Sequence, residues 1–314
     1  MSKFKTALVI HRPKRKQGFE LFMSPLVDDV VTLYAMARSR GKINNDTNCV
    51  TVTLSPQDPD EAHLVNSYHL DVASPDVPAW FSFQIQKSVE KEMRKYVQSC
   101  IINAPITMLA GGQFILAPSV HAGMALDCQV ICMMQGSAIH KVGGSAVVKD
   151  MYARSRITYL AEFARVVLMA DDAAISDMHG CSVVEIMRDD ARIESMHAHS
   201  MVLNMGGKAY IRNMYGHACV DYMRYEAKVG FMRDESYIHY MGGSAQVGRV
   251  FDHAQVGEMN DKSRISHLAR QARSTDMRKL SVIETLGGES TVLSRSTRAK
   301  ILNIEGKHAR VIKP

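Results

Sequence analysis

Long apolar stretches are missing from this sequence. No run approaches the roughly 18 residues that a membrane-spanning helix needs. The amino-terminal segment MSKFKTALVIHRPKRK has a short apolar piece, without the long apolar region and small-residue cleavage site of a signal peptide. A nucleophile elbow, a Walker loop and a dinucleotide fingerprint are also missing. We therefore expect a cytoplasmic protein without a membrane partner, and the sequence offers no common catalytic motif.

Cysteine is scarce and scattered. The chain has six cysteines, at Cys49, Cys100, Cys128, Cys132, Cys181 and Cys219. Three residues separate Cys128 from Cys132, which is not the usual spacing of zinc ligands, and the sequence has no second cysteine pair that could complete a zinc site. Reduced thiols are the expected state in a cytoplasm. The cysteines therefore predict neither a disulfide framework nor a zinc finger, and we expect no cofactor.

The overall composition is that of a folded protein with one unusual feature. Hydrophobic residues make up 46% and charged residues 22%, which excludes a disordered chain. The net charge of +6 and the pI near 8.9 permit nucleic-acid binding without requiring it. The unusual feature is methionine, a flexible gap-filling residue that occurs 21 times.

A nine-residue repeat explains the methionines. From Ala125 to Ile304 the chain divides into twenty repeats without an insertion, such as GGSAVVKDM and YARSRITYL. Position 4 is always Ala, Ser or Cys, position 6 is Val or Ile except at Ser274, and position 9 is apolar except at Arg295. Thirteen of the residues at position 9 are Met. Positions 4 and 6 are two residues apart, so both side chains can face inward on one short strand. Position 9 is expected to reach the interior past a bend. Positions 1 to 3 carry residues that are typical of turns.

Alternation at position 6 indicates the size of one coil. Eight of ten residues in the Val130 set, spaced by eighteen, are Val, and eight of ten in the Ile139 set are Ile. Two repeats per coil, with two slightly different sheets, account for this alternation. The predicted fold is therefore mainly β, a two-sided β-solenoid of about ten 18-residue coils. At about 4.8 Å per coil, the rod is roughly 50 Å long.

The residues before the repeat predict a small α+β domain. We expect a helix within 19–37, a strand over 48–54 and an amphipathic helix that carries Ile85, Val89 and Met93 on one stripe. Such a domain would cap the first coil and protect its free edge from aggregation. The predicted divisions are an α+β domain at 1–105, an irregular first coil at 106–124, the solenoid at 125–304 and a C-terminal cap at 305–314.

The residue pattern of the later repeats resembles that of a known group of repeat proteins. The run GGSAQVGRVFDHAQVGEM at 242–259 is similar to tandem nonapeptide-repeat proteins of the A-x-V-G-x-M type from bacteriophage and prophage genomes. The stretches HLDV at 69–72 and DVPAWF at 76–81 resemble the domain that precedes such repeats. The resemblance covers most of the chain. It implies a β-solenoid and a phage-related origin, in the cytoplasm of an infected or lysogenic bacterium, and no particular chemistry.

The two outward faces differ in character. A contiguous apolar stripe usually marks an interface, so we expect the Val-type face to form a homodimer or a higher homo-oligomer. A loop or the N-terminal domain folded over the stripe is the alternative. The expected interface residues are Val147, Val167, Leu168, Val183, Ile186, Met201, Leu203, Cys219, Tyr222, Tyr237 and Tyr240.

Two further surfaces carry candidate binding residues. On the Ile-type face a basic column, diluted by acids such as Glu194, could contact nucleic acid. Its members are Arg156, Arg192, Arg212, Lys228 and Arg264. On one edge, side chains that stack coil on coil about 5 Å apart could hold a metal, or could simply form a solvated turn column. These residues are Cys181, His197, His199 and His217.

The function expected from these features is binding. We expect a non-enzymatic scaffold whose faces self-associate and hold a host macromolecule, such as a host protein, in host takeover or anti-defence. A virion or tail adhesin is one alternative. An enzyme or metal-binding protein is another, using the histidine edge or the N-terminal domain, where His69 and Asp71 lie near Ser67. The enzyme alternative is the less favoured, and the sequence assigns no catalytic residue.

Overall fold

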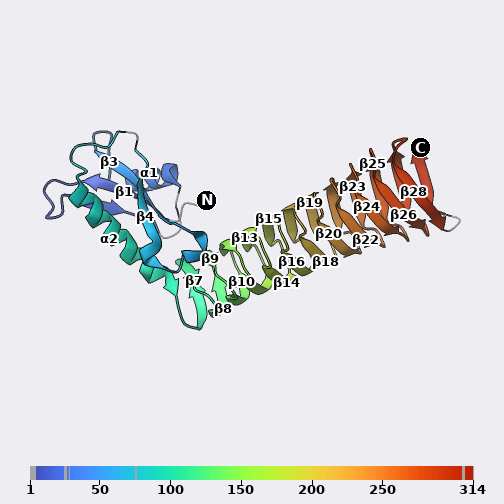
Figure 1. The fold of residues 1–314 in the computed structure, drawn as a ribbon, viewed down its shortest axis with the longest axis horizontal. Coiled ribbons are helices and arrows are strands. Elements are labelled where there is room, and N and C mark those ends of the chain that lie inside the picture. The colour runs from blue at the N-terminus through green and yellow to red at the C-terminus, as the bar shows by residue number, and fades with distance from the viewer. Residues whose placement is uncertain (1–4, 25–26, 28, 75, 306–307, 314) are drawn as a thin grey trace. The chain divides into compact units, whose positions relative to one another are not determined.

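The computed structural model describes residues 5–24, 27, 29–74, 76–305 and 308–313 (Figure 1). Contacts within the chain divide it into two compact units. The first comprises residues 1–103 and 112–117, and the second comprises 104–111 and 118–314. Among the helices in this described part of the chain, none has both the length and the apolar character needed to cross a membrane.

The first unit is built on a four-stranded antiparallel sheet with two α-helices. The strand order is β2-β1-β3-β4. The elements of the sheet are β1 (Lys5–His11), β2 (Phe19–Phe22), β3 (Cys49–Pro56) and β4 (Tyr68–Val72). The helices are α1 (Val30–Ser39) and α2 (Phe83–Cys100), with short 3-10 turns η1 (Pro59–Glu61) and η2 (Val65–Ser67). Two short strands, β5 (Ile101–Ile102) and β7 (Gln113–Leu116), pair in parallel.

Two predicted elements of this unit are present, and one begins later than expected. The strand expected at 48–54 is β3, and the amphipathic helix is α2, which buries Val89 and Met93. The first helix begins only at Val30, because residues 19–22 form β2 instead and pair with β1. The Asp29 carboxylate fixes this start by accepting hydrogen bonds from the backbone N–H groups of Val31 and Thr32, at 3.1 and 2.8 Å.

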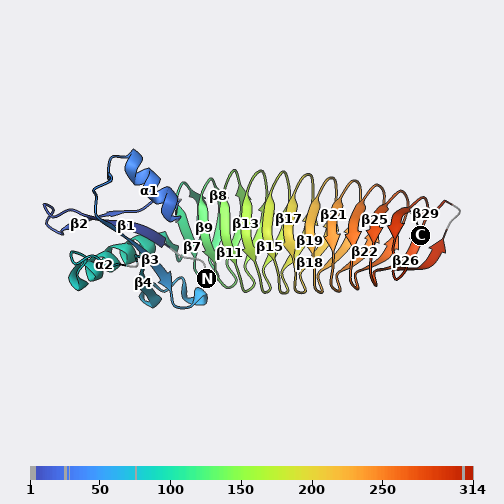
Figure 2. The ribbon, with the colours of Figure 1, turned by 90° about the horizontal axis from the view of Figure 1, so that it is seen from above.

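The second unit is a two-sided parallel β-solenoid (Figure 2). We call its sheets the Ile sheet and the Val sheet, after the residue that predominates at position 6. The Ile sheet contains β6 (Ile106–Ala110), β8 (His121–Leu126), β10 (Ala138–Gly143), β12 (Arg156–Leu160), β14 (Ala174–Met178), β16 (Arg192–Met196), β18 (Tyr210–Met214), β20 (Lys228–Met232), β22 (Gln246–Val250), β24 (Arg264–Leu268), β26 (Val282–Gly287) and β28 (Lys300–Glu305).

The strands of the Val sheet alternate with those of the Ile sheet along the chain. Within this unit they are β9 (Gln129–Met133), β11 (Val147–Met151), β13 (Arg165–Met169), β15 (Val183–Met187), β17 (Met201–Met205), β19 (Cys219–Met223), β21 (Tyr237–Met241), β23 (Gln255–Met259), β25 (Arg273–Met277), β27 (Thr291–Arg295) and β29 (Arg310–Lys313). The chain therefore passes from one sheet to the other at every repeat.

The register of the sheets confirms the eighteen-residue coil. Val166 pairs with Val184 in one sheet and Ile175 pairs with Ile193 in the other, so the two ladders lie on opposite walls. The Ile sheet has twelve strands. The solenoid thus has about twelve turns rather than ten, because parallel pairing begins with the shorter coils of β6 and β8, before the strict repeat. At the other end Thr291 pairs with Arg310, one residue beyond the usual spacing, where the repeat register breaks.

The interior is a stack of small, β-branched and sulfur-containing side chains. In one coil Ala191, Ile193 and Met196, at positions 4, 6 and 9, are all fully buried. Each strand spans positions 5 to 9, so position 4 lies in the turn and position 9 ends the strand, where we had expected it beyond a bend. Two consecutive residues, at positions 7 and 8, separate the buried positions 6 and 9. The strand is therefore locally irregular, as at a β-bulge.

The four-residue turns share one backbone geometry. From Gly144 to Gly288 the residue at position 2 has a positive φ, for example 57° at Asp189, 55° at Ala198 and 60° at Gly207. The N–H at position 3 donates to the carbonyl at position 2 of the preceding coil, as from Lys208 to Asp189 at 2.8 Å. The turns thus continue the hydrogen-bonded ladder around the edge, and side chains at positions 1 and 3 are left free to vary.

Candidate functional site

The expected interface residues lie together on the outward face of the Val sheet. Val183, Met201, Cys219 and Tyr237 are consecutive ladder partners at position 5. Leu168 pairs with Ile186, and Tyr222 with Tyr240, at position 8. Val147 also lies at position 5, and Val167 and Leu203 at position 7. The sequence grouping therefore corresponds to one physical surface.

This face is apolar without being purely so. Ile186 and Tyr222 are its most open members, 42% and 44% exposed. Arg165 and Glu185 interrupt the ladders and form an ion pair across the face, at 2.9 Å. Burial raises the pKa of the Cys219 thiol to about 11, with the nearby Asp221 carboxylate adding to the effect, so this thiol stays protonated at neutral pH.

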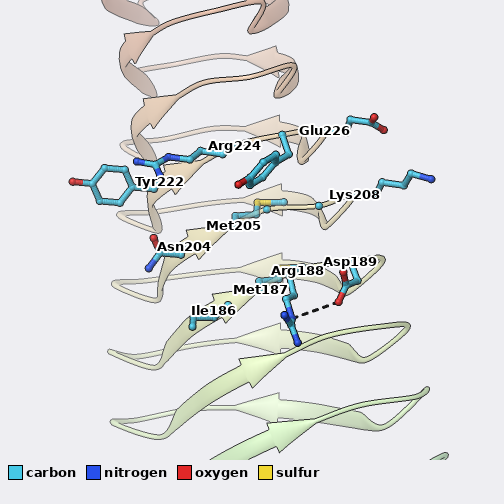
Figure 3. Close-up of a pocket in the computed structure, with 13 residues that line it drawn as sticks. Ile186, Met187, Arg188, Asp189, Asn204, Met205, Lys208, Tyr222, Arg224 and Glu226 are labelled. Atoms are coloured by element: carbon cyan, nitrogen blue, oxygen red, sulfur yellow. Dashed lines mark ion pairs between the residues drawn. The ribbon is translucent and has the colours of Figure 1, made fainter. Parts of the chain in front are cut away.

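A pocket opens at one end of these strands, where the Val-sheet strands turn toward the Ile sheet (Figure 3). We call this side of the solenoid the arginine edge. It holds Arg188, Gly206 and Arg224 in successive coils at position 1. The missing side chain at Gly206 leaves a notch between the two arginines. The pocket has a volume of about 530 Å³ and is lined by Ile186, Met187, Arg188, Asp189, Asn204, Met205, Gly206, Gly207, Lys208, Tyr222, Arg224, Tyr225 and Glu226.

Tyr225 forms a wall of the pocket from a strained backbone position. Its φ is +61°, at the turn position where Gly207 and Gly243 stand in the neighbouring coils. A bulky residue in this region costs about 1–3 kcal/mol. The ring is 69% exposed and lies over Gly206, where an added Cβ would be 3.3 Å from its Cδ2. The turn imposes this backbone in the other coils too, so what distinguishes Tyr225 is an exposed aromatic ring at this position, beside the pocket.

Arg224 lies beside two aromatic rings. Its guanidinium carbon lies 5.2 Å from the centroid of Tyr222 and 5.6 Å from that of Tyr240. On the other side of the notch, Arg188 Nε is 3.5 Å from the Asp189 carboxylate (Figure 3). Cation–π contacts and planar hydrogen-bond donors let such arginines bind a carboxylate or an aromatic side chain of a partner.

The pocket combines opposite charges with an apolar floor. Its cations are Arg188, Lys208 and Arg224, and its acids are Asp189 and Glu226. Met187 and Met205 at position 9 form part of the lining. The lining therefore offers charged groups of both signs beside an apolar surface.

The basic residues predicted on the opposite face do share the Ile sheet. Arg156, Arg192, Lys228 and Arg264 lie at position 5 and are exposed. They do not form an unbroken positive strip, because Ala174, Tyr210 and Gln246 stand between them in the ladder. Two cations of this face are also paired with acids. Arg212 contacts Glu194 at 3.2 Å, and Arg264 contacts Glu284 at 2.8 Å.

The predicted metal residues lie on the other side of the solenoid, which we call the histidine edge. They do not form a single cluster. His199 and His217 stack with ring centroids 4.9 Å apart, and Cys181 is exposed. His197 stacks instead on His179, at 4.6 Å. Burial lowers the pKa of His197 and the neighbouring His179 lowers it further, while the nearby Asp177 carboxylate opposes them.

The histidine and aspartate of the first unit are also close together. His69 Nε2 lies 3.1 Å from an Asp71 carboxylate oxygen. The Ser67 hydroxyl is engaged elsewhere, since it donates to the backbone carbonyls of Glu61 and Leu64 at 3.1 and 2.8 Å. This geometry aims no serine at the imidazole, so the three side chains do not assemble a nucleophile.

Several residues of these sites were not singled out from the sequence. They are Arg188, Gly206, Arg224 and Tyr225 at the pocket, and Asp177 beside the histidines. Reading position 1 at intervals of eighteen would have shown the Arg-Gly-Arg order. Comparison with known proteins adds no further assignment, because no family model, curated protein or solved structure matches this chain.

Proposed function

We propose that this protein is a binding scaffold that pairs with a second copy of itself through the outward face of the Val sheet. One observation carries the proposal. Ile186 and Tyr222 belong both to the apolar ladders of that face and to the lining of the pocket, so ladders and pocket form one continuous surface. Contiguous apolar surface of this kind usually marks an interface.

The repeat itself favours a second copy as the partner. Ladder residues on this face recur at the strand spacing of about 4.8 Å. A second solenoid presents the same spacing, so ridges and grooves can match coil after coil. A two-fold contact also repeats each favourable interaction, because the same patch is used on both copies. The pocket then provides an anchoring site for a projecting side chain, as is typical of interface centres.

The cellular setting is part of the same proposal. We place the scaffold in the cytoplasm of an infected or lysogenic bacterium, where its remaining faces hold a host macromolecule. The support is the A-x-V-G-x-M cadence of residues 242–259, which resembles phage repeat proteins. Residues at positions 1 and 3 of the turns vary from coil to coil, and such variation suits recognition of an irregular partner.

The experiment is analytical ultracentrifugation of a triple variant, Val183→Lys with Met201→Glu and Leu203→Lys. Val183 and Met201 are ladder partners, so their new charges attract within one chain. Lys at position 203 stands between Glu185 and Asp221 of the same column. The variant should therefore fold, while its charges would be desolvated in the dimer interface. We expect the wild type to sediment as a dimer, with twice the chain mass of 34.9 kDa, and the variant to sediment as a monomer.

A matched control changes the opposite face. Ala174→Glu with Ser176→Lys and Ser266→Lys introduces the same number and balance of charges on the Ile sheet. This control should remain a dimer. A wild type that is monomeric at tens of micromolar, or a Val-sheet variant that keeps its dimer, would refute self-association through this face. Dissociation of the control alone would assign the interface to the other sheet.

A further inference from the structure

A compact group of three potential metal ligands lies on the histidine edge. His179 and His197 occupy position 1 in successive coils, with rings 4.6 Å apart and inclined by only 4°. Asp177, near the end of β14, points to the same place, and its carboxylate lies 3.9 Å from His197 Nε2. One ligand atom from each of these residues lies within 4.8 Å of the other two. The group joins the end of one strand to two turns that the coil brings together.

From this juxtaposition we propose that Asp177, His179 and His197 bind one divalent transition-metal ion, with zinc as the reference ion. Two imidazole nitrogens and one carboxylate oxygen are a ligand set that zinc, nickel and copper accept. Calcium and magnesium prefer ligands that are all oxygen, so the two histidines disfavour them. Three protein ligands on one side would leave the remaining coordination positions open to water or to a partner.

The required rearrangement is confined to the side chains. Two ligands on one tetrahedral zinc are about 3.3 Å apart, so donor atoms that lie within 4.8 Å of one another must approach by up to about 1.5 Å. The two imidazole planes must also turn toward each other, because parallel rings do not direct their nitrogen lone pairs at one point. Half-exposed side chains at a turn can supply this by rotation about their side-chain bonds. The backbone beneath them is fixed, because the His179 and His197 N–H groups donate to Leu160 and Met178 carbonyls, each at 2.9 Å. Tyr215 stacks on the far side of His197 at 5.1 Å and limits its movement.

The same edge provides an internal comparison. His199 and His217 stack at 4.9 Å with rings inclined by 2°, nearly the geometry of the proposed pair. His217 is also 3.3 Å from the Glu235 carboxylate. Even so, Asp177 with His179 and His197 is the only set of three such ligands that comes together among the residues the structure describes. A stacked histidine pair alone therefore does not make the site, and the Asp177 carboxylate distinguishes it.

The test is calorimetric titration of the full chain, free of any purification tag, with zinc chloride at pH 7.5. We expect one zinc ion per chain. His197→Ala and Asp177→Asn should each weaken binding at least about tenfold, since even indirect ligand partners contribute that much. The matched control His199→Ala removes an equivalent stacked imidazole and should bind zinc like the wild type. A second titration with calcium chloride should give no binding at this site.

Cobalt spectroscopy separates this site from a thiolate site. Cobalt bound by Asp177, His179 and His197 should give visible bands without a thiolate charge-transfer band, and His197→Ala should abolish those bands. A thiolate band, lost in Cys181→Ser, would overturn the proposed ligand set. So would an absence of stoichiometric zinc binding, or equal losses in His199→Ala and His197→Ala. These outcomes are independent of self-association, because binding is read out per chain and the Val-sheet triple variant should retain it.

Discussion

The two edges of the solenoid are built from the same four-residue turn, yet they carry different chemistry. On the histidine edge, position 1 holds His179, His197 and Tyr215, whose rings stack along the axis. On the arginine edge, the same position holds Arg188 and Arg224 around the notch at Gly206. The turn backbone does not explain this difference, because position 2 has a positive φ on both edges.

The comparison shows which residues the fold constrains. Positions 4, 6 and 9 fill a shared interior, and position 2 must adopt a left-handed backbone. Positions 1 and 3 meet neither requirement, and around the pocket and the histidines their residues are at least partly exposed. Function can therefore diverge between the edges without a cost to the core, as long as side chains in one column tolerate each other. Four substitutions test this division, beginning with the largest expected effect.

Ile193→Ala should be the most damaging of the four. The side chain is fully buried in the interior that both edges share, and such truncations cost about 2–5 kcal/mol. Its neighbour Arg192 is exposed in the same strand, and Arg192→Ala should change the free energy of unfolding by less than about 0.5 kcal/mol. Urea denaturation followed by circular dichroism measures both. Similar losses for the two variants would show that the interior is not the dominant constraint.

Gly207→Ala should have the next largest effect on stability. A Cβ at this position would lie 2.6 Å from the Asp189 backbone nitrogen, so the turn must shift, at a cost of about 1–3 kcal/mol. On the histidine edge, Ala198→Gly relaxes the equivalent position. Removing the backbone strain at this position stabilises the fold by about 1–2 kcal/mol. The greater flexibility of glycine in the unfolded chain offsets about 0.5–1 kcal/mol of this gain. Thermal unfolding should thus show a clear loss for the first variant only.

Tyr225→Gly should separate binding from stability. Glycine removes the strain at φ +61°, so the free energy of unfolding should stay level or rise by up to about 1 kcal/mol. The pocket loses a wall, so self-association should weaken when measured by sedimentation equilibrium. Ala198→Gly makes the same kind of backbone change away from the pocket and should leave the dimer intact. A strong destabilisation by Tyr225→Gly would instead give this tyrosine a structural role.

The smallest expected effect concerns Asp261 on the arginine edge. Its carboxylate accepts hydrogen bonds from Lys279 at 2.7 Å and from the Gly243 N–H at 3.1 Å, and these hold its pKa below the ordinary value. A lowered folded-state pKa means stabilisation above about pH 4 that is lost as the pH falls. Asp261→Asn should therefore lower the melting temperature slightly at pH 7, and the two melting curves should converge near pH 3. A constant difference would exclude the ionic contribution.

Much of the solenoid could be predicted because its sequence signal is repeated twenty times. The spacing of Val184 and Ile193 assigned them to opposite sheets, and the structure agrees. The number of coils was underestimated, because β6 and β8 keep the hydrogen-bonding pattern without keeping the residue pattern. In the first unit β1 escaped notice, since Lys5 to Ile10 are all buried and show no alternation of apolar and polar residues.

The candidate sites were harder to predict than the fold. A column at one turn position does not include Asp177, which comes from the preceding strand, so the histidine cluster could not be completed from the column alone. The pocket arises from an absent side chain at Gly206 and from the ring of Tyr225 leaning over it. Neither feature is visible as a motif, because both depend on contacts between residues in neighbouring coils.

The two-repeat coil restricts how the gene for this protein can change in length. Insertion of a single nonapeptide would send every later repeat to the opposite wall, so Val256 would enter the Ile sheet and the two edges would exchange their residues. Insertion or loss of two nonapeptides preserves both walls and alters only the length of the rod. Viable length variants should therefore differ by even numbers of repeats, and each such step lengthens or shortens the surface along which another solenoid can align.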